Sequence, residues 1–160
     1  MEDKILLVDD EEGIRKVLHI SLADAGYRVF EAADGSEALE IFKRENPPIV
    51  LTDIKMPGID GVDLLRRIKH ENPEAEVIMI TGHGDMDLAI RSLKHDATDF
   101  ITKPINDDIL KIAVHKARER RLIREKLREY TESLETLVRE KSALQDRLSS
   151  LGLRISSAGK

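Results

Sequence analysis

Five short apolar runs, separated by segments with the spacing of amphipathic helices, constrain the fold of this chain more than any other feature. The runs are rich in β-branched residues and occupy residues 5–8, 28–30, 49–52, 77–81 and 99–102. Strands that alternate with helices predict a parallel sheet with right-handed crossovers. Three of the runs, ILLV, IVLT and VIMIT, are apolar without alternation, which is typical of strands covered by helices on both faces. We therefore predict an α/β fold, a doubly wound five-stranded parallel sheet.

The segments between the runs carry helical signals. The first helix is predicted from one apolar stripe, Ile14, Val17, Leu18 and Leu22. Gly26 follows this stripe at the position of a C-cap, while Ser36 and Asn106 are expected to cap the second and fifth helices. The fourth helix is marked by Met86, Ile90 and Leu93.

Composition and charge limit the classes of function. The 160 residues suffice for one domain and an appendage. The net charge is −9 over residues 1–119 and +4 over residues 120–160, which predicts two parts and argues against direct binding of nucleic acid by the first. The sequence has no cysteine, no apolar run near the ~20 residues of a membrane span, and no positively charged N-terminus of a signal peptide. We expect a cytoplasmic protein without a membrane partner.

Polar side chains stand at the ends of the apolar runs. Asp9 and Asp10 follow the first, Asp53 follows the third, Thr81 ends the fourth and Lys103 follows the fifth. The carboxyl ends of parallel strands share one edge of the sheet, where such folds bind ligands. Carboxylates at this edge suit Mg²⁺, and one of them can act as a nucleophile towards phosphorus. The metal and the ammonium would neutralise the transferred group, so the set predicts phosphoryl transfer.

Each of these residues also has a simpler interpretation when taken alone. Asp9 and Asp10 could be helix N-caps, Asp53 a turn acid, Thr81 a strand residue and Lys103 a solvated loop charge. Five such residues would have to reach the same sheet edge by chance, so we favour the functional interpretation.

Four motifs, LLVDDEEG, LTDIKMPGIDG, MITGHGD and DFITKPI, resemble in order and spacing those of the receiver domain of two-component response regulators. The resemblance covers about residues 3–120 and implies the flavodoxin-like fold with strand order 2-1-3-4-5. It implies that Asp53 is the phosphoacceptor and takes its phosphoryl group from a sensor histidine kinase. It also implies that Mg²⁺ is bound by Asp10, Asp53 and the backbone carbonyl of Lys55, with Asp9 helping through water.

The resemblance further assigns the residues that respond to phosphorylation. Lys103 is expected to pair with the phosphoryl group, while Thr81 and Phe100 are the expected switch residues. Plain core packing is the alternative for Phe100. Asp96 stands where the family usually has glycine, so we expect a slightly strained turn there, with a positive φ that Asp tolerates better than most residues.

The C-terminal part predicts a coiled coil. Neither Pro nor Gly occurs between residues 105 and 151, so the fifth helix is expected to continue without a break. Heptad spacing relates Ile123, Leu127, Tyr130, Leu134, Leu137, Leu144, Leu148 and Leu151. Lys141 fills the one missing core position, and about four heptads favour a left-handed coiled coil over a surface helix. We predict a receiver over residues 1–120, an extended helical linker over 121–151, and a parallel homodimer through residues 123–151. A helix folded back on its own receiver is the alternative.

Residues 152–160 are expected to lie just before an output domain, to which the helix would relay the phosphorylation state. The sequence does not identify that domain, the cognate kinase, its stimulus or the phosphoryl lifetime. Two other functions stay open: a Mg²⁺-dependent aspartyl-phosphate phosphatase and a constitutive dimerisation scaffold. We expect the chain to be a phosphoacceptor rather than an enzyme.

Overall fold

The computed structural model describes residues 3–152 and has the predicted α/β fold. Five strands alternate with five helices: β1 (Lys4–Val8), α1 (Glu12–Asp24), β2 (Arg28–Ala32), α2 (Gly35–Glu45), β3 (Ile49–Asp53), α3 (Gly61–Glu71), β4 (Glu76–Thr81), α4 (Met86–Lys94), β5 (Asp99–Thr102) and α5 (Asp107–Ser150). All strand pairs are parallel, and their order is β2-β1-β3-β4-β5. This confirms the predicted fold class and strand order.

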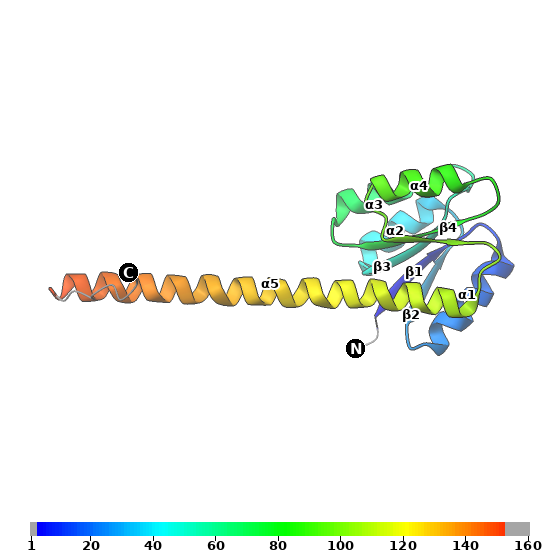
Figure 1. Cartoon of the computed structure of the whole chain (residues 1–160). Helices are drawn as coiled ribbons and strands as arrows, with labels where there is room; N and C mark the ends of the chain where they lie inside the picture. The colour runs from blue at the N-terminus through cyan, green and yellow to red at the C-terminus, as the bar shows by residue number, and fades with distance from the viewer. Residues whose placement is uncertain (1–2, 153–160) are drawn as a thin grey trace. The chain divides into compact units, whose positions relative to one another are not determined.

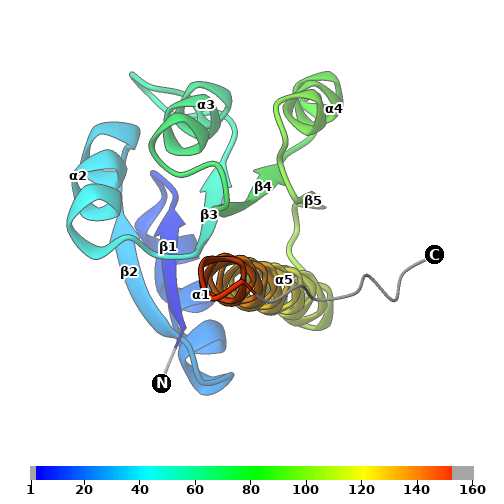
Figure 2. The ribbon, with the colours of Figure 1, turned by 90° about the vertical axis from the view of Figure 1, so that its left-hand side faces the viewer.

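The chain divides into two units, Met1–Arg121 and Leu122–Lys160. In the first unit, α2, α3 and α4 lie on one face of the sheet, while α1 and the beginning of α5 lie on the other (Figures 1 and 2). Each face has its own apolar cluster. One includes Phe42, Leu64, Leu65 and Ile68 from α2 and α3, and the other includes Leu18, Leu22, Leu110 and Val114 from α1 and α5. The central strands are buried on both faces, which explains why their sequences do not alternate.

Several helix ends agree with the sequence, and one differs. Gly26 has φ +98° just after α1, as expected for a C-cap glycine. The carboxamide of Asn106 accepts hydrogen bonds from the amides of Asp108 and Ile109, at 2.8 and 3.2 Å. The prediction for Ser36 was wrong, because α2 already begins at Gly35 and its N-cap is Asp34. The Asp34 carboxylate accepts a hydrogen bond from the amide of Glu37, which is the bond expected of an N-cap residue.

Two helices bury different residues from those that marked them in the sequence. Met86, Ile90 and Leu93 of α4 are 45%, 50% and 41% exposed, because the buried side of α4 consists of the smaller Ala89 and Ser92. Val17, part of the predicted stripe of α1, is likewise exposed. The hydrophobicity of these residues located the helices correctly but did not identify their buried faces.

The expected turn before β5 is present. Asp96 has φ +66°, in the left-handed region where glycine is normally preferred. The amide of Ala97 beyond it donates to the carbonyl of Ser92 at 3.1 Å. Aspartate is one of the few other residues that enter this region, so the turn survives the departure from glycine.

The fifth helix continues without a break to Ser150, as the absence of Pro and Gly predicted. Most of the seam side chains named above are exposed, from Leu144 at 54% to Leu151 at 73%. Among residues 3–152, no helix is both long enough and apolar enough to cross a membrane.

Candidate functional site

The carboxyl ends of β1, β3, β4 and β5 place the polar residues of the sequence motifs at one edge of the sheet. Strand register aligns Asp53, the last residue of β3, with Ile80, and Thr81 with Thr102. Asp9 directly follows β1 and its amide donates to Ala32 at 3.2 Å. The site therefore lies where β1 and β3 are neighbours and the chain order of the sheet reverses, the usual location of ligand sites in such folds.

Lys103 connects the two buried carboxylates. Its ammonium donates a hydrogen bond to Oδ2 of Asp53 at 3.0 Å and lies 3.6 Å from Oδ2 of Asp9. The backbone amide of Lys103 donates to the carbonyl of Thr81 at 2.8 Å, and the Lys103–Pro104 peptide bond is cis. Burial lowers the pKa of this ammonium, but the bond to Asp53 and the charges of Asp53 and Asp9 outweigh it, so the pKa is raised. The side chain is thus held as a cation.

Three carboxylates form the anionic part of the site. Carboxylate oxygens of Asp9, Asp10 and Asp53 all lie within 4.8 Å of one another. Asp9 and Asp53 are buried, whereas Asp10 is exposed. Burial is the main cause that raises the pKa of both Asp9 and Asp53, and the charge of Lys103 only partly opposes it. Two buried carboxylates that repel each other favour a bound cation.

The surroundings of Asp9 fit a hard divalent cation. Its Oδ1 accepts a hydrogen bond from the amide of Glu11 at 2.9 Å. Its Oδ2 is buried and receives no hydrogen bond among the described residues. A buried acceptor without a donor is costly, and oxygen donors from two or three carboxylates are what Mg²⁺ takes in proteins. Lys55, whose carbonyl is the further predicted ligand, lies two residues beyond Asp53.

The two predicted switch residues come from neighbouring strands. Thr81 is fully buried at the end of β4, and its hydroxyl donates to the carbonyl of Gly82 at 3.3 Å. Phe100 in β5 is partly buried against the cluster that α2, α3 and α4 cover. Both core packing and a switching role are compatible with this position of Phe100.

Gly61 is a site-forming residue whose role the sequence did not reveal. Its amide donates to the carbonyl of Ile54 at 2.7 Å. A Cβ at this position would lie 2.2 Å from the carbonyl oxygen of Asp53. The absence of a side chain therefore lets α3 approach the strand end that carries Asp53. Asp60 and Gly61 are adjacent in the sequence, but such a pair by itself indicates only a helix start.

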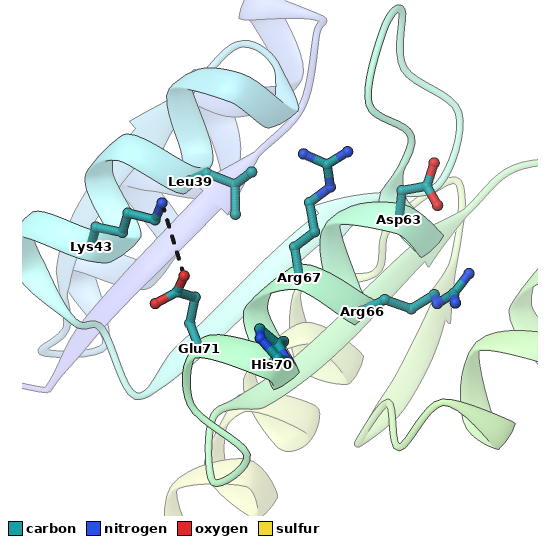
Figure 3. A pocket seen from close by; sticks show the side chains of 7 residues that line it. All are labelled: Leu39, Lys43, Asp63, Arg66, Arg67, His70 and Glu71. Atoms are coloured by element: carbon teal, nitrogen blue, oxygen red, sulfur yellow. Dashed lines mark ion pairs between the residues drawn. The ribbon is translucent and has the colours of Figure 1, made fainter.

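One groove of the first unit lies away from this site. A groove of about 570 Å³ between α2 and α3 is lined by Leu39, Lys43, Asp63, Arg66, Arg67, His70 and Glu71 (Figure 3). Lys43 is paired with Glu71 at 3.9 Å, and the side chains of Arg66 and Arg67 point in different directions (Figure 3). The cations that line this groove therefore do not converge on one point.

Comparisons with known proteins identify the family of the chain. Residues 5–115 match the family model described as response regulator receiver domain. The chain is 40% identical over 116 residues to sporulation initiation phosphotransferase F of Bacillus subtilis, covering 72% of this chain and 94% of that protein. It is 37% identical over 149 residues to the nitrogen assimilation regulatory protein NtrX of Azorhizobium caulinodans, covering 91% of this chain but only 33% of the relative.

Solved structures give the same result. A response regulator receiver domain protein from Clostridium thermocellum superposes with a TM-score of 0.74 at 38% identity, over 76% of this chain and 98% of that one. This chain spans less than a third of several other curated relatives, such as the 27% of DctD from Pseudomonas aeruginosa. Receiver domains are phosphoacceptors of two-component systems and generally bind Mg²⁺ at an acidic pocket. The chain belongs to the response regulator receiver family.

Proposed function

We propose that this chain accepts a phosphoryl group on Asp53 from a sensor histidine kinase and passes the change of state to its fifth helix. The observation that carries the proposal is the pairing of Asp53 with the Lys103 ammonium, 3.0 Å apart, beside two further carboxylates at one strand edge. A nucleophile needs its negative charge stabilised without losing access to phosphorus. Asp53 is 6% exposed, so its side chain is not fully enclosed.

The transfer step follows from the chemistry of these groups. An oxygen of Asp53 attacks the phosphorus of the donor's phosphohistidine and forms a new O–P bond. The P–N bond breaks, its electron pair leaves with the imidazole, and the imidazole takes up a proton from solvent. The Lys103 ammonium is placed to neutralise charge on the transferred group. Thr81 would donate its hydroxyl hydrogen to a phosphoryl oxygen once the loop after β4 moves.

We propose Mg²⁺ as the cofactor, held by Asp10, Asp53 and the Lys55 carbonyl, with Asp9 acting through water. When bound, the ion would supply positive charge at the phosphoryl oxygens. Oδ2 of Asp9 receives no hydrogen bond among the described residues, and this, with the raised pKa of both buried carboxylates, supports a cation at this position.

A groove beside the site is a suitable docking place for the phosphoryl donor. It has a volume of about 480 Å³, and its apolar lining includes Ile14, Val17, Pro104 and Ile105 next to Lys103. Val17 is 65% exposed, whereas the adjacent Leu18 is buried. An apolar partner surface bound here would be adjacent to the Asp53–Lys103 pair.

We further propose that residues 123–151 form a parallel homodimeric coiled coil. The exposed seam on one helix supports this assignment, because an apolar heptad stripe normally packs against a second helix. Phosphorylation would act on this seam through Thr81, Phe100 and the packing of α5, and an output domain beyond residue 152 would receive the change. The lack of cysteine in the sequence suits a reducing compartment, and we place the protein in the cytoplasm.

The other two functions are not favoured. The match of residues 5–115 to the response regulator receiver domain favours a phosphoacceptor over a phosphatase. A scaffold with an inactive site would not need the paired Lys103.

Phosphorylation by a small donor tests the proposed function. The full chain, incubated with phosphoramidate and Mg²⁺, is expected to gain the mass of one phosphoryl group. Asp53→Asn should abolish the gain, whereas Asp24→Asn, at the exposed end of α1, should not affect it. Labelling that persists in Asp53→Asn, or steady turnover of the donor without labelling, would contradict the proposal.

A further inference from the structure

Three helices of the first unit begin after an aspartate at the N-cap, and one of these aspartates does not cap its own helix. Asp34 before α2 accepts a hydrogen bond from the amide of Glu37, and Asp60 before α3 accepts one from the amide of Asp63, both at 2.8 Å. Asp85 before α4 makes no such bond. Aspartate is among the best N-cap residues. The missing cap bond therefore indicates that the carboxylate of Asp85 has another partner.

That partner is the ammonium of Lys55. Oδ1 of Asp85 lies 2.8 Å from Nζ of Lys55, although the Lys55 side chain is 69% exposed and the Asp85 side chain only 7%. Oδ1 is buried and receives no hydrogen bond from elsewhere among residues 3–152. The contact with Asp85, and the charge of that group, raise the pKa of the Lys55 ammonium. A buried carboxylate that depends on a single cation is costly to leave alone.

The pair connects the two loops that border the phosphoacceptor. Lys55 lies two residues beyond Asp53, in the loop between β3 and α3, and Asp85 lies four residues beyond Thr81, in the loop between β4 and α4. The loops start from the neighbouring strands β3 and β4. Just beyond β3, the amide of Ile54 donates a hydrogen bond to the carbonyl of Ile80 in β4 at 3.1 Å. Movement of the β4–α4 loop towards a phosphoryl group would therefore change the Lys55–Asp85 contact.

We propose that Asp85 is a positioning residue with two alternative partners: Lys55 in the unphosphorylated state, and the first amides of α4 after the β4–α4 loop has moved. The ion pair holds the loop, and with it Thr81, away from Asp53. The free energy lost when the ion pair breaks is offset by the N-cap hydrogen bond that Asp85 then accepts. A ligand shifts such an equilibrium only through its different affinity for the two states. The inference rests on the proposed function, because the phosphoryl group on Asp53 is what Thr81 would approach.

Substitution of Lys55 separates this mechanism from simple electrostatics. Loss of a cation two residues from Asp53 would by itself weaken binding of an anionic phosphoryl mimic. Loss of the restraint would instead tighten it. For Lys55→Met we expect about fivefold tighter binding of beryllofluoride in Mg²⁺, the lower end of a typical coupling between sites. Asp85→Asn should tighten binding as well, since asparagine still caps a helix, and the double variant should bind no tighter than either single one.

The measurement is a titration of the full chain with Mg²⁺ and beryllofluoride, followed by ¹⁹F NMR. Lys16→Met, which removes an exposed pair with Glu12 at 2.9 Å in α1, is expected to retain the wild-type affinity. No binding to the wild type would overturn the proposed function, and Asp53→Asn must abolish the signal. Binding to the wild type, together with unchanged or weaker binding to Lys55→Met, would overturn the role of the ion pair alone.

Discussion

The close approach of α3 to the phosphoacceptor strand gives the sharpest structural prediction, which is the effect of Gly61→Ala. The new Cβ would lie 2.2 Å from the carbonyl oxygen of Asp53 and 2.7 Å from Cα of Ile54. Both atoms belong to the backbone, so no side chain can rotate away. Either α3 or the end of β3 must move, and movement of β3 displaces the Asp53 carboxylate from Lys103.

The magnitude follows from the size of the overlap. Overpacking of a core usually costs about 1–3 kcal/mol, and a backbone contact that is about 1 Å too short belongs at the upper end. Replacement of a glycine within a helix by alanine normally raises the free energy of unfolding by about 0.5–1 kcal/mol. We therefore expect a net loss of about 2 kcal/mol or more in the free energy of unfolding. With a urea m-value of about 1–3 kcal/mol/M, a loss of about 2 kcal/mol lowers the midpoint by about 0.7–2 M.

Urea unfolding at fixed protein concentration, together with the initial rate of labelling by phosphoramidate, measures both effects. Gly13→Ala is the matched control, because it also replaces a glycine in the first turn of a helix but has no atom within 4 Å of its new Cβ. The control should gain stability and label at the wild-type rate. A Gly61→Ala protein with wild-type midpoint and wild-type labelling would refute the claim that this contact positions Asp53.

Three further substitutions test other features. Because burial raises the pKa of Asp53, its ionisation destabilises the native state as pH rises above the unfolded-state pKa. Asp53→Asn should therefore raise Tm in calorimetry at neutral pH without Mg²⁺. This gain in Tm should vanish in acid, where the carboxyl of Asp53 is protonated in both the native and the unfolded state. Added Mg²⁺ should raise the Tm of the wild type only. Lys141→Leu should strengthen self-association in sedimentation equilibrium, since it completes the apolar seam; unchanged association would argue against this seam. Asp96→Gly should stabilise the protein by about 0.5 kcal/mol in urea unfolding, because φ +66° suits glycine and the entropy cost of glycine offsets part of the gain.

The sequence predicted the fold well because its strands are buried on both faces and its turns are marked by specific residues. Continuous apolar runs identified the central strands, and Gly26, Asn106 and Asp96 occur at the helix ends and the turn where the sequence placed them. The helix faces were harder to predict. Leu93 and Val17 are apolar yet exposed, since hydrophobicity locates a helix but does not say which partner covers each side.

Some residues of the candidate site could likewise be predicted from the sequence, and others could not. Asp9, Asp53 and Lys103 could be assigned to one edge because strand ends of a parallel sheet have a fixed order. The roles of Gly61 and Asp85 could not be assigned, because both depend on distances across loops that no local pattern encodes. For Asp85, the sequence shows a good N-cap residue at a helix start, and only the three-dimensional contact with Lys55 shows that its carboxylate is engaged elsewhere.

The charge balance of the site explains why cation binding and phosphorylation should depend on each other. Asp9, Asp10 and Asp53 contribute three carboxylates and Lys103 one ammonium, so an added phosphoryl group increases an existing excess of negative charge. A divalent cation lowers the free energy of the phosphorylated form more than that of the free form, because more anionic oxygens then surround it. Linkage requires the converse as well: a phosphoryl group, or a mimic of it, must tighten the binding of the cation by the same factor. The carboxylates thus favour the unphosphorylated form when the cation is withdrawn, and the aspartyl phosphate when it is supplied.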